Sequence, residues 1–428
     1  MINKELVQRI YDKIAKTTTA DDFSLNISEV EKTHTRFAQN GITQHINGVN
    51  NRIGLSVSFG NKSGSASVNS ISDETVNYLI KTAEDIAKKS QPNPEFMPTP
   101  GACDLLDIKN YAEATQKLIN EKMVDDIAFC VDKAKKMKAK LSGMSTKSES
   151  KYFYLTKNGF FGDEKQTAFN HSMTINKDKT ETKVEKGVKD YADFSMEKEM
   201  DQLLSQINSL GKPEKIEPGR MPVILRPNAV KDWFMYLFWI FDQRSADDGL
   251  TPFTCKMNEK MFGEKFSCYS SISDPQVVAP KWMMDGIPIK NIDWVRNGVL
   301  KNMFATRYYA QLKNIEPHRA YNLIIDGEGT SETEMMKMVD RGVIVNSLWY
   351  IRNIDQKRGE MTGLTRDGVM YFEDGMIKQS ALNFRWNEIL NEATQRILAL
   401  GESTPLQSWM KVPTMLIDGF NFVDVTSF

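Results

Sequence analysis

The four histidines of the chain give the first test for hydrolytic metal chemistry. A zinc peptidase of the thermolysin kind carries His-Glu-x-x-His, because this spacing puts two imidazoles on one helix face with a carboxylate nearby as base. The histidines here are His34, His45, His171 and His318. The residues that follow them are threonine, isoleucine, serine and arginine, respectively. The motif is therefore absent, and a zinc site would need scattered ligands or carboxylates.

Two of these histidines, His34 and His45, flank the turn signal Asn40-Gly41 and could approach each other across a β-hairpin. The simpler interpretation is a pair of surface or half-buried strand residues. Nucleophilic acyl transfer has no support, because the chain has no Gly-x-Ser-x-Gly elbow and no histidine is placed as base to a cysteine. Cys130 falls on the apolar side of a predicted long helix, which is typical of a small core residue.

Two glycine-containing segments resemble nucleotide-binding loops only superficially. Gly60-Asn-Lys-Ser-Gly64 lacks the Gly-Lys-Ser/Thr ending and a helix directly after it, so a hairpin turn is favoured. Asp326-Gly-Glu-Gly329 lacks the third glycine of a dinucleotide fingerprint. Composition and spacing thus reveal no legible active site.

The overall charge argues against nucleic acid or an anionic membrane as partner. The 428 residues include 55 lysines and arginines against 56 acidic residues, a net charge of −1, so there is no general cationic field. The longest apolar run, Trp233 to Phe241, is far shorter than the roughly 20 residues of a membrane span. The N-terminus has no signal-peptide pattern, and the four cysteines form no CxxC pair. These features predict a soluble cytoplasmic protein.

Hydrophobic periodicity in the first half of the chain predicts helices interleaved with hairpin-forming strands. In chain order the predicted segments are a helix at 3–17, strands at 23–70, a helix from the cap Ser72 to Ser90, a proline-rich connector at 91–101, a helix at 112–140, strands at 141–193 and a helix at 196–210.

A polar linker with two prolines, Gly211 to Gly219, separates this half from a differently patterned one. We therefore predict two domains, residues 1–212 and 219–428. The second begins with a buried strand and a core helix, Asn228 to Phe241, and then consists mostly of short strands and turns, with helical pieces at 331–341 and 386–400. Since helices and runs of strands are segregated more than alternated one by one, the predicted class is α+β: an N-terminal sheet with long helices, then a β-rich domain with a buried helix.

The stretch from Arg341 to Gly368, which reads RGVIVNSLWYIRNIDQKRGEMTGLTRDG, is far more distinctive than any motif above. With Phe372 to Ile377, it resembles the C-terminal signature of the TldD/PmbA family. That family comprises bacterial and archaeal proteins once called modulators of DNA gyrase and now regarded as metalloprotease subunits.

Shorter segments on both sides of the linker resemble the same family, so the resemblance covers nearly the whole chain. Each segment is weak alone, but they occur in the family's order and spacing. They are Thr35 to Ile42, Gly64 to Ser67, Ser72 to Glu74, Gly219 to Leu225, Asp285 to Pro288 and Gly298 to Leu300.

The resemblance also implies which kind of subunit this chain is. The catalytic subunits carry His-Glu-x-x-x-His on the helix after the Pro-Val-Val-Leu strand, where glutamate and the final histidine help to hold zinc. The corresponding positions here hold Met235, Tyr236 and Ile240, and no cysteine follows Cys268, although the family has a C-terminal one. The chain therefore resembles the PmbA or TldE kind, with no catalytic or metal-binding residues of its own. The resemblance places the zinc in a TldD-like partner.

Two apolar segments are candidates for contact with that partner or with a peptide. The run Trp233 to Phe241 would be either a core helix or an interface helix. Trp349, Tyr350 and Arg352 lie in a predicted alternating strand and could carry aromatic and guanidinium contacts to a peptide or partner, or form an ordinary cross-strand cluster.

The resemblance implies a cytoplasmic, non-catalytic subunit of a zinc metalloprotease complex, active on peptides or unfolded proteins. The partner's Zn²⁺ would polarise the scissile carbonyl and activate water. Two alternatives stay open: a self-sufficient peptidase with an unrecognised site, and a homodimeric peptide-binding or regulatory scaffold. Direct DNA binding, suggested by the old family name, is disfavoured by the net charge.

Overall fold

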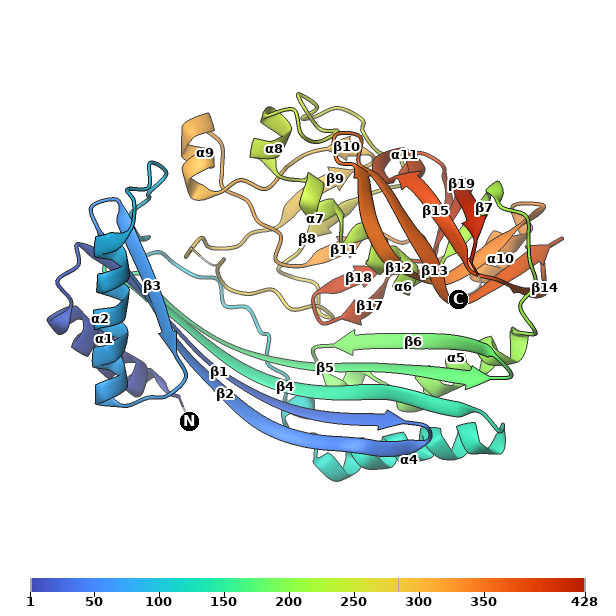
Figure 1. Cartoon of the computed structure of the whole chain (residues 1–428), viewed down its shortest axis with the longest axis horizontal. Coiled ribbons are helices and arrows are strands. Elements are labelled where there is room, and N and C mark those ends of the chain that lie inside the picture. Colours follow the sequence, from blue (N-terminus) through green and yellow to red (C-terminus); the bar gives the residue numbers. More distant parts are fainter. Residues whose placement is uncertain (1, 284, 427–428) are drawn as a thin grey trace.

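The computed structural model of the chain describes residues 2–283 and 285–426. Positions 1, 284, 427 and 428, which fall inside the two predicted domains, lie outside the described residues. The described chain combines helices with three separate sheets, which confirms the predicted α+β class (Figure 1). Among its helices, none is long and apolar enough to cross a membrane.

The first sheet has six antiparallel strands in the order β3-β2-β1-β4-β5-β6. Its strands are β1 (Asp22–Ala38), β2 (Gly41–Phe59), β3 (Lys62–Val68), β4 (Lys140–Thr156), β5 (Phe161–Lys177) and β6 (Thr180–Val188). Both predicted hairpin turns are confirmed: Asn40-Gly41 joins β1 to β2, and Gly60, with φ of +54°, turns β2 into β3. A backbone with positive φ favours glycine, because it carries no Cβ.

Helices cover one face of this sheet, because alternate strand residues are apolar on that side only. Phe23, Leu25 and Ile27 of β1 are buried there, whereas Ser24 and Asn26 face the other side. The helices of this half are α1 (Lys4–Thr17), α2 (Asp73–Lys89), the short α3 (Glu113–Gln116), α4 (Asn120–Lys136), the 3₁₀ turn η1 (Tyr191–Asp193) and α5 (Met196–Ser209). They form two cores, one under α1 and α2 and one under α4 and α5.

Local signals located these helices well, with one exception. The Ser72 side chain accepts a hydrogen bond from Thr75 N, so the predicted N-cap is confirmed. The predicted helix 112–140 is wrong as one element, because it is interrupted between α3 and α4. The carbonyls of Gln116 and Leu118 instead accept hydrogen bonds from the Lys147 ammonium on β4, at 2.7 and 2.9 Å.

The second half of the chain builds two further sheets. One contains β7 (Gly219–Leu225), β12 (Arg341–Asp355), β13 (Glu360–Glu373), β14 (Met376–Ala381), β15 (Phe384–Ile389), β16 (Ile397–Leu400) and β19 (Met415–Val425). The other contains β8 (Cys268–Ser270), β9 (Ile292–Arg296), β10 (Val299–Leu300), β11 (Leu323–Ile325), β17 (Thr404–Gln407) and β18 (Met410–Val412). In the first of these sheets β12, β7, β19, β15 and β13 pair in turn, and a β12–β13 pairing closes the ring.

The second half also contains short helices, some packed against these strands and others, such as α8 and α9, on the outside (Figure 1). They are α6 (Pro227–Phe234), α7 (Leu237–Ile240), α8 (Gln243–Asp247), α9 (Arg307–Lys313), α10 (Glu332–Lys337) and α11 (Leu390–Thr394). The helical piece predicted at 386–400 is confined to α11, with strands on both sides of it. Phe384 and Trp386 are buried while Arg385 between them is exposed, so this segment begins as a period-two strand, and only α11 follows as a helix.

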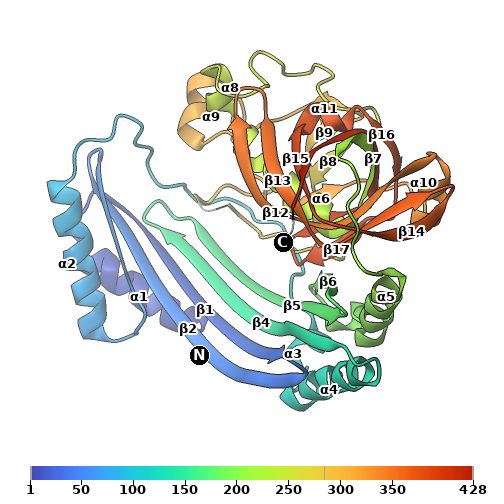
Figure 2. The same ribbon diagram turned by 45° about the vertical axis from the view of Figure 1, so that its right-hand side comes forward.

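The first sheet curves beneath the second half with its helix-free face turned inward (Figures 1 and 2). Its strand β6 lies against β13 and β17, and Asn346 of β12 donates a hydrogen bond to the Lys183 carbonyl of β6 at 2.8 Å. At the opposite end of the strand order, β2 and β3 lie far from this contact. The second half of the chain therefore covers the β6 edge of the first sheet.

Limited proteolysis is expected to cut first at the linker between the halves or in the connector 91–101. Lys215 is exposed, and the three sheets divide along the chain at this linker. A tryptic cut after Lys215 would leave two fragments that stay associated, because many contacts cross the boundary. The domain boundary itself stays a prediction. Early cuts inside the first sheet, read by mass spectrometry of timed digests, would contradict it.

Candidate functional site

The positions that would correspond to a zinc motif lie where α6 ends and α7 begins. The predicted single helix Asn228–Phe241 is broken there. Met235 is 38% exposed, the Tyr236 hydroxyl donates to the Ile351 carbonyl at 3.1 Å, and Ile240 is fully buried in the core. A thioether, an engaged phenol and a buried hydrocarbon do not fit zinc, which prefers imidazole, thiolate and carboxylate ligands. Among the described residues, no group of three or more His, Cys, Asp or Glu side chains could hold a metal ion.

The apolar run around these positions serves mainly as core. Trp233 is fully buried, and its ring packs edge-to-face on Trp386 at 5.6 Å and on Phe420 at 5.5 Å. Trp239 departs from this pattern, because it is 63% exposed. Most side chains of the run therefore lie in the core, one large aromatic ring lies at the surface, and the interface role weighed from the sequence stays a prediction.

The three predicted contact residues lie together on β12. Trp349 is 54% and Tyr350 is 60% exposed, and Arg352 is exposed beside them. The Arg352 guanidinium lies 4.3 Å from the centre of the Tyr350 ring, and that of Arg366 on β13 lies 4.7 Å from the Trp349 ring. Both are cation–π pairs at a solvent-exposed site.

A β-bulge explains why neighbouring residues are exposed together. The β12–β13 register shifts between Trp349 and Arg352, and Tyr350 has a positive φ of +55°. A regular strand would place Trp349 and Tyr350 on opposite faces. Simple alternation therefore could not have predicted that their side chains are exposed together.

This strand adjoins the region that corresponds to the zinc motif. Besides bonding to Ile351 of β12, Tyr236 packs its ring 5.6 Å from that of Trp239. We use the term aromatic–arginine surface for the exposed residues joined in this way, which are Trp239, Trp349, Tyr350, Arg352 and Arg366. It has the composition enriched at protein interfaces.

A buried charge cluster anchors α6 to the first sheet. The Lys231 ammonium lies 2.9 Å from the Glu185 carboxylate on β6 and 3.4 Å from Asp232, and Glu185 also pairs with Lys183 at 3.2 Å. Asp232 in turn accepts a hydrogen bond from Leu348 N on β12 at 3.1 Å. Sequence reasoning missed this cluster, although a Lys-Asp pair inside an apolar helix was a usable signal.

Replacing Asp232 by asparagine is expected to remove a contribution to stability that falls as the pH rises from about pH 4 to pH 6. Burial raises the pKa of Asp232 from 3.8 to about 6, although Lys231 opposes the shift. The native carboxyl thus keeps a proton that the unfolded chain releases, so stability falls as pH rises through this window, by about 3 kcal/mol for this group. Urea unfolding at several pH values would measure the difference. Asp201→Asn, at an exposed pair with Lys133, is the control. Parallel pH profiles for wild type and Asp232→Asn would contradict the assignment.

The structure keeps the histidines apart. His34 pairs with Ile46 and His45 with Thr35, so the two imidazoles lie on opposite faces of the sheet. They do not approach each other across the hairpin, and the simpler interpretation as surface or half-buried strand residues is confirmed. His171 is buried, and its Nδ1 shares a hydrogen bond with Ser145 Oγ. Desolvation lowers the pKa of His171 to about 4. His318 is partly buried near Trp294. Each imidazole therefore lies in a different local environment.

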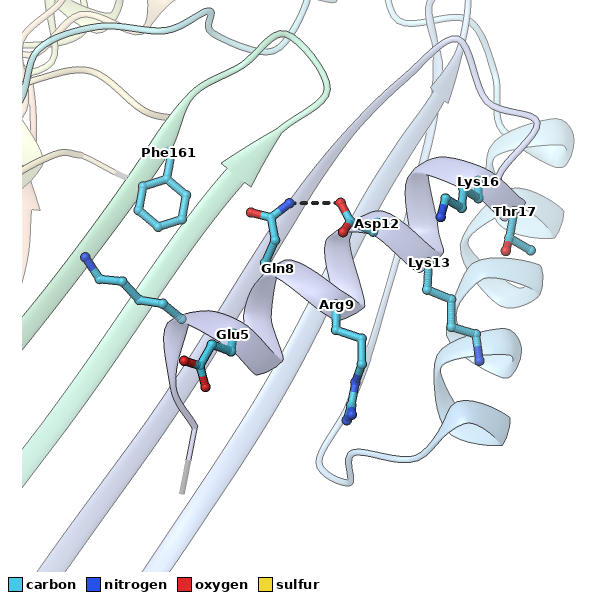
Figure 3. A pocket seen from close by; sticks show the side chains of 9 residues that line it. Glu5, Gln8, Arg9, Asp12, Lys13, Lys16, Thr17 and Phe161 are labelled. Carbon is cyan, nitrogen blue, oxygen red and sulfur yellow. Dashed lines mark hydrogen bonds between the residues drawn. The ribbon is translucent and has the colours of Figure 1, made fainter.

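Two grooves in the first half differ in what they could bind. One of about 860 Å³ follows the outer face of α1, where Gln8 bonds to Asp12 among mixed charges and Phe161 lies opposite (Figure 3). Its acids and bases alternate, as on a solvated helix face. The other, of about 640 Å³, lies on the helix-free face of the first sheet. Its lining is mostly hydroxyl and amide side chains from four strands: Ser24, Asn26, Ser28, Ser56, Ser65, Ser67, Tyr152 and Tyr154, with Arg52.

Cys130 is buried in the core under α4 and α5, as predicted, and burial raises its thiol pKa to about 12. A thiol with so high a pKa is a poor nucleophile at neutral pH. Cys268 is also buried, whereas Cys103 and Cys255 are exposed and unpaired.

Comparison with known proteins gave one family match and several similar folds. Residues 218–424 match the family model described as the PmbA/TldA metallopeptidase C-terminal domain. Among solved structures, TldE from Thermococcus kodakarensis superposes with a TM-score of 0.89 at 17% sequence identity, over 98% of this chain and 100% of that one. A search of curated protein sequences found no match.

Two further solved structures share the fold across their whole length. A putative modulator of DNA gyrase from Thermotoga maritima has a TM-score of 0.86 at 15% identity, covering 98% of this chain and 100% of the other. One from Bacteroides thetaiotaomicron has a TM-score of 0.87 at 16% identity, covering 99% and 100%, respectively. At such low identity these likenesses establish the fold, including that of the first half, which the family model leaves unmatched.

Proposed function

Since residues 218–424 belong to the PmbA/TldD metallopeptidase family, we propose that this chain is the metal-free subunit of a zinc peptidase complex. Its partner would be a TldD-like homologue that carries His-Glu-x-x-x-His and the zinc. Peptides or unfolded polypeptides would be the substrate of the complex, and this chain would help to enclose them. Its place of action would be the cytoplasm, consistent with the exposed free thiols of Cys103 and Cys255.

The observation that carries this proposal is the use made of the motif positions. Tyr236 bonds to the backbone of β12, and Ile240 completes the core. The segment that would carry the metal ligands instead packs in the core, and through Tyr236 it contacts β12 and Trp239 of the aromatic–arginine surface. The fold shared with a TldE structure supports the same subunit type.

The aromatic–arginine surface is the contact that we propose for the metal-bearing homologue. Tryptophan, tyrosine and arginine dominate interface hot spots, because they bury large area with few rotatable bonds and form directional polar contacts. Here two guanidinium groups already stack on exposed rings, which fixes their orientation before association. Such preorganisation lowers the entropy lost on binding.

The polar groove on the first sheet is the surface that we propose for the substrate side. Its serine hydroxyls and Asn26 amide can donate to and accept from the main chain of an extended peptide. Tyr152 and Tyr154 add two aromatic faces, and Arg52 adds one cation. A wall with few aliphatic side chains would hold polypeptides weakly and with little preference for sequence.

Metal analysis of the purified chain tests the assignment of the zinc to the partner. After incubation with excess zinc and desalting, we expect well under one zinc per chain, because Met235, Tyr236 and Ile240 offer no suitable ligands. Inductively coupled plasma mass spectrometry gives the ratio, and a homologue with His-Glu-x-x-x-His is the positive control. About one tightly bound zinc per chain would overturn the assignment and favour a self-sufficient peptidase.

A further inference from the structure

A polar cleft of about 680 Å³ lies where the first sheet meets the second half of the chain. Its walls come from β6 and α5 on one side and, on the other, from the start of α6 and the loops at 329–332 and 401–404. In Figure 1, β6 and α5 lie directly below the second half. The cleft shares no lining residue with the polar groove on the helix-free face of the first sheet.

Hydrogen-bond donors without acceptors gather at the start of α6. Arg226, which precedes this helix, is 9% exposed, and its Nε and Nη2 donate to the Glu332 carboxylate at 2.7 and 2.8 Å. Its Nη1 has no acceptor among the described residues. Since Arg226 gives α6 no side-chain cap, the N–H groups of Asn228 and Ala229 have no acceptor within the helix. These donors and the positive end of the helix dipole suit a carboxylate.

Hydrogen-bond acceptors without donors line the same cleft. Asn228 is 6% exposed, and its Oδ1 has no partner in the described part of the chain. Within residues 2–283 and 285–426, the carboxylates of Glu199 and Glu402 make no ion pair or hydrogen bond, and burial raises the pKa of Glu199. Lys186 lies near both acids without a direct ion pair to either, and burial lowers its pKa. These acceptors suit an ammonium group.

We propose that this cleft binds a small zwitterion of the amino-acid class, which means a free α-amino acid or a short peptide with both ends free. The ligand carboxylate accepts hydrogen bonds at Arg226 and the first N–H groups of α6. The ligand ammonium donates to Glu199, Glu402 and the Asn228 amide oxygen.

The ligand class follows from the presence of both kinds of unpaired group in one cavity. A simple amine would meet the Arg226 guanidinium and leave the donors of α6 unused. A simple anion such as phosphate would use these donors but would lie among the carboxylates that line the cleft, which are Glu185, Glu199, Glu332 and Glu402. A zwitterion offers an opposite charge to each group.

Binding at this place would hold the two halves of the chain together. Glu199 belongs to the first half, whereas Arg226, Asn228 and Glu402 belong to the second. A ligand that contacts both halves of the folded chain stabilises it by mass action. The proposal does not rest on the peptidase complex, because it uses none of the positions that correspond to the zinc motif. Its failure would leave the assignment of the zinc-bearing partner standing.

Calorimetric titration of the purified chain with three matched dipeptides tests the ligand class. Dialanine is expected to bind and to raise the melting temperature. N-acetyl-dialanine lacks the ammonium, and dialanine amide lacks the carboxylate, so each is expected to bind about tenfold more weakly or worse. Inorganic phosphate is expected to compete poorly with dialanine.

Variants assign the two ends of the ligand. Glu199→Gln/Glu402→Gln removes two charges at nearly constant volume and is expected to weaken dialanine binding about fivefold or more, with no further loss for N-acetyl-dialanine. The control Glu113→Gln/Glu264→Gln, at two exposed ion pairs, should bind like wild type. Arg226→Lys keeps the charge but removes the planar fork, so it should weaken binding of dialanine and not of dialanine amide. Circular dichroism checks folding, and the dipeptide series on wild type needs no variant.

Hydrogen exchange locates the bound dipeptide. Protection is expected at α5, at the start of α6 and at residues 401–404 together, because the ligand contacts all three. Protection in β1 to β3 instead would place the ligand in the helix-free groove and overturn the proposal. No binding of alanine, dialanine or trialanine at about 10 mM would do the same. So would capped dipeptides that bind as well as dialanine, or phosphate that binds as tightly, which would indicate a simple anion site.

Discussion

A mixture of this chain with a homologue that carries His-Glu-x-x-x-His is expected to cleave peptides, while this chain alone gives no turnover above background. The expected contrast is large, because activation of water by zinc is the chemical step that Met235, Tyr236 and Ile240 cannot provide. Measurements would compare this chain, the homologue and the mixture on an unfolded polypeptide and on short peptides. A chelator should abolish turnover by the mixture, and restored zinc should recover it.

Variants at the aromatic–arginine surface make this experiment specific. Trp349→Ala/Arg352→Ala is expected to reduce turnover by the mixture at limiting concentration, with recovery at high concentration, because it weakens association rather than chemistry. Leu312→Ala, at an exposed site elsewhere, serves as the matched control. Chelator-sensitive turnover by this chain alone, after contaminating proteases are excluded, would refute the non-catalytic assignment. Equal turnover with and without this chain would refute its role in the complex.

Lys231→Ala is expected to destabilise the protein by about 3–5 kcal/mol, the largest stability effect that we predict for a polar side chain here. The substitution leaves the Glu185 carboxylate buried between the two halves without its main partner. It also removes the cation that lies between the carboxyl groups of Glu185 and Asp232, so that these two groups repel each other. Denaturant unfolding followed by circular dichroism would measure the loss.

The matched control is Lys265→Ala, which removes a surface pair with Glu328 whose two side chains are each 41% exposed. Its expected cost is less than about 1 kcal/mol, because water already solvates both charges. The reversed pair Lys231→Glu/Glu185→Lys should recover part of the lost stability if the interaction itself is responsible. Equal destabilisation by Lys231→Ala and Lys265→Ala would show that the buried cluster contributes no more to stability than a surface ion pair does.

The sequence predicted those parts of the fold that depend on neighbours in the chain. The Ser72 cap, the turns at Asn40-Gly41 and Gly60, and the first helix are set by local hydrogen bonds and periodicity, and all are confirmed. The helical piece expected at 386–400 is confined to α11, because pairing of β15 with β13 and β19 outweighs local propensity before it. Such pairing joins residues too far apart in sequence for periodicity to reveal.

The candidate site shows the same division. Trp349, Tyr350 and Arg352 could be identified from the sequence, and the structure shows them exposed together, but their function stays a prediction. The bulge that exposes them depends on the register with β13. The Lys231–Glu185 pair depends on contact between the two halves. No single-segment pattern contains either feature.

The closed ring of strands in the second half has a consequence for how the protein acquires its structure. Its first strand, β7, pairs with its last, β19, so that Gly219 lies opposite Phe422. The six strands of the first sheet are joined largely by hairpins and can pair as they emerge during synthesis. The ring must instead wait until β19 has been made, with the edges of β7 and β15 open meanwhile, and its long-range closure is expected to be the slow step of folding. Growth conditions or a shortage of chaperones that lengthen this interval should therefore lower the yield of folded protein without changing the stability of the finished molecule.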